Sequence, residues 1–500
     1  MPRGRAVTLC LAVVVLAACR REASAPARAG TSPPPVVPAA VQTGPKNAAG
    51  SGYVAIDPKV YVPGATIARW SHDFDDAAIA DHAWDLWAAL NADSGESYCV
   101  DWQPQRCVSL PVWDTWFSEF EVFKVTPIAP PKHVAAGAPV AGDPSTTRPW
   151  HTPRQISAKS LVVSFVKYNL DFKEFVEANK YDDPATFDAL LVKYNQANTP
   201  LEQRLIAQPP ERGIMLKPAF WLMDADKPTP VPIWKGPGDT IADTTYPERP
   251  TDTSWQNIVV VDPTGTAKND RDITRTLVTP TGTTQWVNKA GSYQVVPLSA
   301  FYSVPLAQKD VEFLLAHNVI ELGGASPLLG GVDLSKVKPT DHIVALLVAM
   351  HVTTAEWPDF WTWQTFFWTP NAHAHPGLKA PFSNFDSVQA YYMIGRDGKP
   401  HIAFNPHIEP PISGATFLVP TERGAHSNCM TCHRAAAWPP RSNNPPNPVF
   451  GSYIATGNLQ RNNPVWFTNR VQTLNMWTMV LENIGGKQTP SNTPVNPSGR

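Results

Sequence analysis

The chain has 500 residues, of which 43% are hydrophobic and 10% are aromatic, and its formal net charge is -2. A chain of this length and apolar content can bury a large core, and its near-neutral charge without a polybasic surface excludes a nucleic-acid-binding role. The 53 prolines and 18 tryptophans predict long irregular loops held in place by aromatic packing.

The N-terminus, residues 1–18, is predicted to be a signal peptide. Two arginines precede an apolar run that is too short to cross a bilayer. Leu16 is too large for an ordinary cleavage site, and the four residues that end at Cys19 resemble a bacterial lipobox. The resemblance implies that Cys19 carries lipid and anchors the protein in the cell envelope. Arg20 behind it favours the outer membrane of a Gram-negative bacterium, and a free periplasmic protein is the alternative.

Residues 19–52 are rich in Ala, Pro, Ser and Gly, a composition that cannot bury enough apolar surface to fold. They are interpreted as a tether between the lipid anchor and the folded body. A similar tail closes the chain at residues 487–500. The globular body is therefore expected to span residues 53–486.

Two regions of the N-terminal half are predicted to be helical. Residues 75–92 place apolar side chains at helical spacing behind Asp75, a candidate N-cap. In residues 171–197, Pro184 behind Asp183 is typical of the first turn of a new helix. We expect these segments to form helical hairpin elements.

Most of the remaining apolar runs have the pattern of strands, bounded by Pro, Gly and Asn. The prediction is therefore a mixed α+β fold with long irregular loops, whose strand order the sequence does not determine. The expected strands are residues 160–165, 213–223, 257–262, 292–301, 341–354, 360–368, 391–395 and 401–405.

Four cysteines remain after the signal peptide and the lipid position are set aside, and they form two local pairs. Cys99 and Cys107 bracket a short loop, so a disulfide is expected between them in an oxidising periplasm. Cys429 and Cys432 are followed at once by His433. This C-x-x-C-H spacing is that of c-type haem attachment, in which one helical turn presents two thiols to the porphyrin vinyl groups and an imidazole to the iron.

Three other interpretations compete for this motif. A thioredoxin-like redox pair requires a strand before the first cysteine, whereas the sequence here predicts a loop. A zinc site requires a fourth ligand, which His426 could supply. A plain structural disulfide with an incidental histidine is the third alternative.

The C-terminal part, residues 340–486, resembles exported mono-haem c-type cytochromes larger than the small soluble carriers. The resemblance rests on residues 351–368, on 405–409, on 427–436 and more weakly on 471–480. It implies one covalent haem c, thioether bonds to Cys429 and Cys432, His433 as the proximal iron ligand, and a periplasmic redox partner.

The sixth iron ligand is left open by the sequence. Met476 and Met479 lie at the usual distance downstream, but residues 468–484 are predicted to form an amphipathic helix, where methionine is more often core filler. The remaining candidates are His351, His407, Met393, His373 and His375, and the absence of any sixth protein ligand is the last alternative.

The state of the sixth position decides between two functions. A saturated iron limits the haem to single-electron transfer, which makes the protein an electron carrier. An open position allows peroxide or a diatomic gas to bind, with His351, His407 or Arg423 as a distal donor.

A glycan-binding role for exposed tryptophans in 356–368 is a third hypothesis. Buried packing is the favoured role of these rings, with Trp361, Trp363, Thr365 and Phe367 on one strand face and Phe366 and Trp368 on the other.

Overall fold

The computed structural model divides the chain into two units, Met1–Lys46 and Asn47–Arg500, and all of the residues that it describes belong to the second. The described residues are 53–100, 102–103, 107–124, 163–233, 258–265, 273–279, 282–288, 294–308, 311, 342–370, 372, 375, 377–399, 401, 403, 405, 407–408, 428–439 and 459–480. The predicted signal peptide, tether and C-terminal tail lie outside them.

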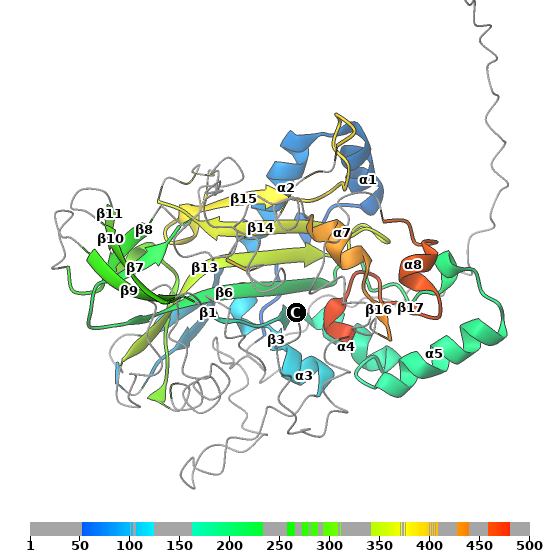
Figure 1. The fold of residues 1–500 in the computed structure, drawn as a ribbon, viewed down its shortest axis with the longest axis horizontal. Helices are drawn as coiled ribbons and strands as arrows, with labels where there is room; N and C mark the ends of the chain where they lie inside the picture. The colour runs from blue at the N-terminus through cyan, green and yellow to red at the C-terminus, as the bar shows by residue number, and fades with distance from the viewer. Residues whose placement is uncertain are drawn as a thin grey trace, which may run out of the picture. The chain divides into compact units, whose positions relative to one another are not determined.

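The centre of the described fold is an antiparallel sheet of eight strands (Figure 1). The main path runs in the order β15-β14-β13-β6-β5-β3, while β12 pairs with β13 and β4 pairs with β6. Its strands are β3 (Phe117–Ser118), β4 (Val163–Ser164), β5 (Lys167–Tyr168), β6 (Ile214–Asp224), β12 (Ser303–Pro305), β13 (Ile343–Thr354), β14 (Thr362–Trp368) and β15 (Phe385–Gln389).

The three longest strands of this sheet, β6, β13 and β14, coincide closely with apolar runs that the sequence predicts to be strands. In β13 every residue except His351 is buried, and in β14 every residue is buried. Strands buried on both faces read as continuous apolar runs rather than as alternating ones. Strands β13 and β14 are therefore enclosed on both sides, which fits the large apolar content of the chain.

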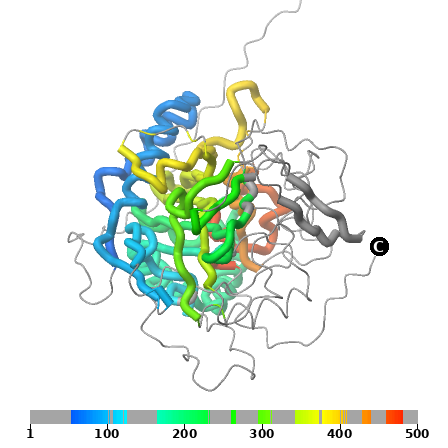
Figure 2. Tube along the Cα trace, turned by 90° about the vertical axis from the view of Figure 1, so that its left-hand side faces the viewer, coloured from blue at the N-terminus to red at the C-terminus, as the bar shows by residue number. Residues whose placement is uncertain are grey.

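The two faces of β14 pack against different parts of the chain. Phe366 stacks on Trp87 of helix α2 (Asp76–Leu90), with ring centroids 4.2 Å apart. Trp363 points the other way and contacts the C-terminal part of the chain, where it meets His433. Figure 2 shows the N-terminal helices in blue and the C-terminal segments in orange and red on different sides of the strands. The predicted alternation along β14 is thus confirmed for these side chains.

The predicted helices are present, and their caps are those expected. Asp75 caps α2 by accepting a hydrogen bond from the Ala78 amide at 3.2 Å, and Asp183 caps α5 with Pro184 in its first turn. The mixed α+β prediction is therefore confirmed. The helices are α1 (Gly64–Asp73), α2, α3 (Glu119–Phe123), α4 (Leu170–Asn179), α5 (Pro184–Gln196), α7 (Cys429–Arg434) and α8 (Pro464–Phe467), with 3-10 turns η1 (Pro58–Val60), η2 (Val112–Thr115), η4 (Leu201–Gln203), η5 (Leu298–Ala300) and η6 (Phe382–Asn384).

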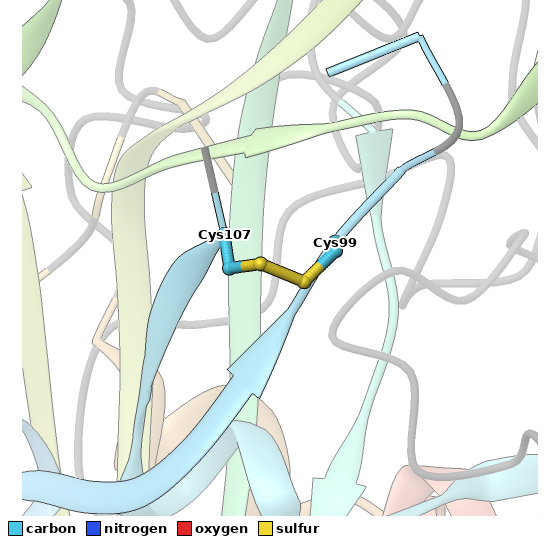
Figure 3. The surroundings of a disulfide bond; sticks show 2 residues. All are labelled: Cys99 and Cys107. Carbon is cyan, nitrogen blue, oxygen red and sulfur yellow. A yellow bond between two sulfur atoms is a disulfide. The ribbon is translucent and has the colours of Figure 1, made fainter. Parts of the chain in front are cut away.

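The predicted disulfide is present and joins the two strands of a small antiparallel sheet. β1 (Asp93–Tyr98) ends just before Cys99, and β2 (Val108–Pro111) begins just after Cys107 (Figure 3). The other small sheets contain β7 (Thr229–Pro232), β8 (Ile258–Asp262) and β11 (Gln294–Pro297), then β9 (Ile273–Thr279) with β10 (Gly282–Asn288), and β16 (Ala437–Trp438) with β17 (Val471–Gln472).

Two predictions of local structure are wrong. Residues 391–395 contain two bends and a single β-bridge residue, Ile394, rather than a strand. Residues 468–476 do not belong to a C-terminal helix, because they contain β17 and a turn in which Leu474 and Asn475 adopt positive φ. Helical structure begins only at Trp477. A leucine and an asparagine in left-handed conformation end any helix, and long-range contacts rather than local propensity hold them there.

Candidate functional site

The two cysteines and His433 lie on the short helix α7, whose start is fixed by Asn428. The Asn428 side chain accepts hydrogen bonds from the amides of Met430 and Thr431 at 2.9 and 3.3 Å, which is N-capping geometry. Its Nδ2 group donates to the carbonyls of Tyr392 and His401 at 3.1 and 2.9 Å. One buried asparagine therefore both begins the helix and fastens it to the chain that follows β15.

The helical turn places Cys429 and Cys432 three residues apart, and residues at this spacing lie on one side of a helix. Cys429 is buried, and its Sγ atom lies 3.4 Å from the Ala403 carbonyl oxygen, whereas Cys432 is half-buried. Both cysteines fall within the described chain, and they are not joined in a disulfide. The structural-disulfide interpretation of this pair therefore finds no support in the structure.

His433 is held by two contacts from distant parts of the chain. Its ring packs against Trp363 with centroids 4.1 Å apart, and its Nδ1 atom lies 2.8 Å from the Asn475 carbonyl oxygen. A carbonyl oxygen only accepts hydrogen bonds, so Nδ1 carries the ring proton and Nε2 keeps its lone pair. Burial lowers the pKa of His433 to about 4, which keeps the imidazole neutral at neutral pH. A neutral imidazole with one nitrogen anchored in this way is typical of a metal ligand.

Asn475 owes its position to a network around Asp359. Its backbone has φ of 73°, and its Nδ2 group lies 3.3 Å from each of the carbonyl oxygens of Asp359 and Phe360. The guanidinium groups of Arg434 and Arg461 also donate to the Asp359 carbonyl. The carbonyl that holds His433 is therefore itself held in place by the loop between β13 and β14.

His351 and Lys217 lie on the sheet face that carries Trp363. His351 on β13 is directly opposite both Lys217 on β6 and Thr365 on β14, and directly paired residues share one face. His351 and Lys217 are each half-buried, while their neighbours along both strands are buried. The pKa of His351 is lowered well below its ordinary value, first by burial, then by the charge of Lys217 and by the positive charge that His433 carries when it is protonated. This places His351 near His433.

The methionine candidates for the sixth iron ligand lie together in the core. Met393, Met476 and Met479 are buried in the same apolar cluster as Cys429 and Trp363. Met476 directly follows Asn475, whose carbonyl contacts Nδ1 of His433.

The histidine candidates His407 and His375 lie in different surroundings. His407 is buried and follows Asn405, which donates to Thr365 at 2.8 Å, and burial lowers the His407 pKa to about 3. His375 stacks on Trp84, which contacts Phe366, so it lies toward the α2 face of β14. Among the earlier candidates, Cys19, His373, Arg423 and His426 lie outside the described residues.

These residues fit a covalent haem in their donor chemistry. One helical turn offers two thiols and a neutral imidazole whose Nδ1 is already bonded, within an apolar cluster that contains five buried methionines and three buried tryptophans. Haem attachment uses this set of groups and a dry surrounding of this kind. In the described part of the chain, no three His, Cys, Asp or Glu side chains are grouped in a way that would hold a metal ion, which gives the zinc interpretation no support there.

Comparison of the chain with protein-family models, with curated proteins and with solved structures finds no match. In the described residues, no helix combines the length and the apolar character that a membrane span requires.

Sequence reasoning did not identify the contacts that support His433. Asn475 lies 42 residues from His433 along the chain, and Arg461 and Lys217 also come from distant segments. The local sequence carries one weak signal, because asparagine tolerates positive φ better than most residues. That signal does not predict that Asn475 contacts His433, because the contact depends on the tertiary fold.

Proposed function

We propose that the chain is an exported c-type cytochrome that binds one haem through Cys429 and Cys432, uses His433 as proximal ligand and transfers single electrons. The observation that carries the proposal is the state of His433: its imidazole is neutral, its Nδ1 is bonded to a carbonyl, and it follows two thiols on the same helical turn. When bound, the haem supplies a one-electron couple between ferric and ferrous iron.

The protein around α7 orients the ligand and excludes water. Trp363 covers one side of the imidazole, and the Asn475 carbonyl fixes its rotation, so little reorganisation is needed when the charge of the site changes. The buried rings and methionines around Cys429 keep the surroundings apolar. Of the four tryptophans in 356–368, Trp361, Trp363 and Trp368 are buried and offer no stacking surface for a glycan.

The cell-envelope location is part of the same proposal. A lipid on Cys19 would keep the protein at the membrane, and residues 19–52 would tether the folded body to that anchor. The Cys99–Cys107 disulfide is consistent with export into an oxidising compartment.

A haem enzyme or gas sensor is the second candidate function, and the pairing of His351 with Lys217 supports it. Both side chains are half-buried on the sheet face that carries Trp363, and His351 is neutral at neutral pH. A neutral imidazole of this kind can either ligate the iron or accept a proton from a bound peroxide.

Carbon monoxide distinguishes the two functions. The full chain is expressed with a haem-maturation system, and its reduced absorption spectrum is recorded with and without the gas. An electron carrier with two protein ligands keeps its spectrum unchanged. A shift on addition of carbon monoxide supports the enzyme or sensor, and a protein without a c-type haemochrome spectrum contradicts both functions.

A further inference from the structure

Two buried arginines meet beside the proximal histidine. Arg434 and Arg461 are only 6% and 7% exposed, and both donate to the carbonyl oxygen of Asp359. Arg434 also lies over the ring of Phe360, 4.4 Å from its centroid. Asn475, whose own carbonyl holds His433, donates to the same Asp359 oxygen. The two guanidinium groups therefore share the Asp359 carbonyl oxygen as acceptor. The same oxygen binds Asn475, the residue whose own carbonyl contacts His433.

The positive charge of this pair is only partly compensated. Asp359 is the carboxylate that the described residues place against the pair, with its Oδ1 atom 3.4 Å from Arg461 Nε, and its side chain is 50% exposed. A guanidinium group stays protonated at neutral pH, so both buried arginines carry their positive charge. Two cations and one half-exposed anion leave about one net positive charge in a buried setting.

We propose that Arg434 and Arg461 form a buried cationic pair that raises the reduction potential of the haem held by His433. This inference rests on the proposed function. Oxidation of the iron adds one positive charge, and a nearby positive charge in a low-dielectric surrounding disfavours that step. The balanced step is the gain of one electron by ferric iron, which a redox partner supplies, with no proton or bond change at the arginines.

The test uses two substitutions whose electrostatic effects have opposite signs. Arg461→Gln removes one positive charge and keeps a donor group, whereas Asp359→Asn removes the negative charge and keeps the backbone carbonyl to which both arginines bind. Asp359 has φ of 76°, a conformation that asparagine tolerates well, so the second variant is expected to fold normally. The reduction potential of each full-length, haem-loaded variant is measured by spectroelectrochemical titration at low ionic strength.

We expect the potential to fall in Arg461→Gln and to rise in Asp359→Asn. The shift in Arg461→Gln should be on the order of tenfold in the ferric-to-ferrous ratio, which is about 59 mV for one electron, and that in Asp359→Asn should be smaller because the carboxylate is half-exposed. A purely structural role would loosen the site in both variants and shift both potentials in the same direction. Equal potentials in all three proteins, or shifts of the same sign, overturn the inference.

Two further outcomes separate this inference from the proposed function. If Arg461→Gln does not fold, the rise expected for Asp359→Asn decides alone, and an unchanged or lower potential in that variant overturns the inference. If the unaltered protein takes up no covalent haem, the proposed function fails and the inference fails with it. A normal haem with an insensitive potential refutes the inference and leaves the function standing.

Discussion

At the scale of single residues, the decisive contact is the one between Asn475 and His433. Asn475 presents its carbonyl to Nδ1 only because its backbone adopts positive φ, and its side chain secures that turn on Asp359 and Phe360. This contact fixes the ring orientation and the tautomer together. In the proposed haem site, the ligand strength of His433 would therefore depend on a residue that lies outside the C-x-x-C-H motif.

The backbone strain at Asn475 predicts a difference between two substitutions. Asn475→Gly and Asn475→Ala both remove the side-chain hydrogen bonds, but only alanine has to hold positive φ against its Cβ atom. We expect Asn475→Ala to be less stable than Asn475→Gly by about 1–2 kcal/mol. Chemical denaturation of both variants gives this difference, and equal stabilities would show that the turn is not strained.

His407 predicts a loss of stability in acid. Its pKa is lowered to about 3 by burial, below the ordinary value of about 6.5, so the unfolded chain binds a proton that the folded chain refuses. The contribution of a neutral His407 is complete above about pH 6.5 and is lost as the pH falls toward 3. At about pH 5 the loss should be about 2 kcal/mol.

The measurement is the free energy of unfolding at several pH values between about 4.5 and 7.5. In His407→Gln, the slope of the free energy of unfolding against pH should decrease by up to the equivalent of one bound proton in this window. The same change at His72, whose side chain is 87% exposed, serves as the control and should leave the slope nearly unaltered. An unchanged slope in His407→Gln would refute the assignment of this acid sensitivity to His407.

At the scale of secondary-structure elements, a buried ion pair joins β5 to the 3-10 turn η2. Lys167 donates to Asp114 Oδ1 at 2.6 Å, and the Tyr302 hydroxyl donates to Oδ2 at 2.6 Å. Both charged side chains are fully buried. Removing one member of such a pair leaves an uncompensated charge, which costs about 3–5 kcal/mol.

We therefore expect Lys167→Met to destabilise the protein by about that amount. The double variant Lys167→Met with Asp114→Asn should recover part of the loss, because asparagine is uncharged and can still accept the Tyr302 hydrogen bond. Thermal or denaturant unfolding of the single and double variants measures the effect. A double variant that is less stable than Lys167→Met would contradict this electrostatic account.

The elements differ in how far the sequence predicts them. Strands β6, β13 and β14 are long apolar runs, and α2 and α5 carry clear caps, so local pattern and tertiary structure agree. The segment before Trp477 differs because its apolar residues pack in a strand and a turn against α7 and not along a helix. Periodicity records which residues are buried, but it does not record what they pack against.

At the scale of the whole molecule, the candidate site depends on segments that the sequence separates widely. The proposed donor set of Cys429, Cys432 and His433 is local, and its prediction rests on sequence spacing alone. Its surroundings combine β6, β13, β14, α7 and the chain after β17, and the pairing of Lys217 with His351 follows only from strand register. A large protein around one short motif is therefore explained in part by the number of elements that hold His433.

The most direct test of the central claim is whether a haem becomes covalently attached to the two cysteines. The full chain and the Cys429→Ser, Cys432→Ser double variant are expressed with a haem-maturation system, and denatured samples are examined by intact mass and by the pyridine haemochrome spectrum. We predict that the unaltered protein gains the mass of one haem and shows a c-type haemochrome, and that the double variant shows neither. An unaltered protein without bound haem, or a double variant that still carries covalent haem, would contradict the account.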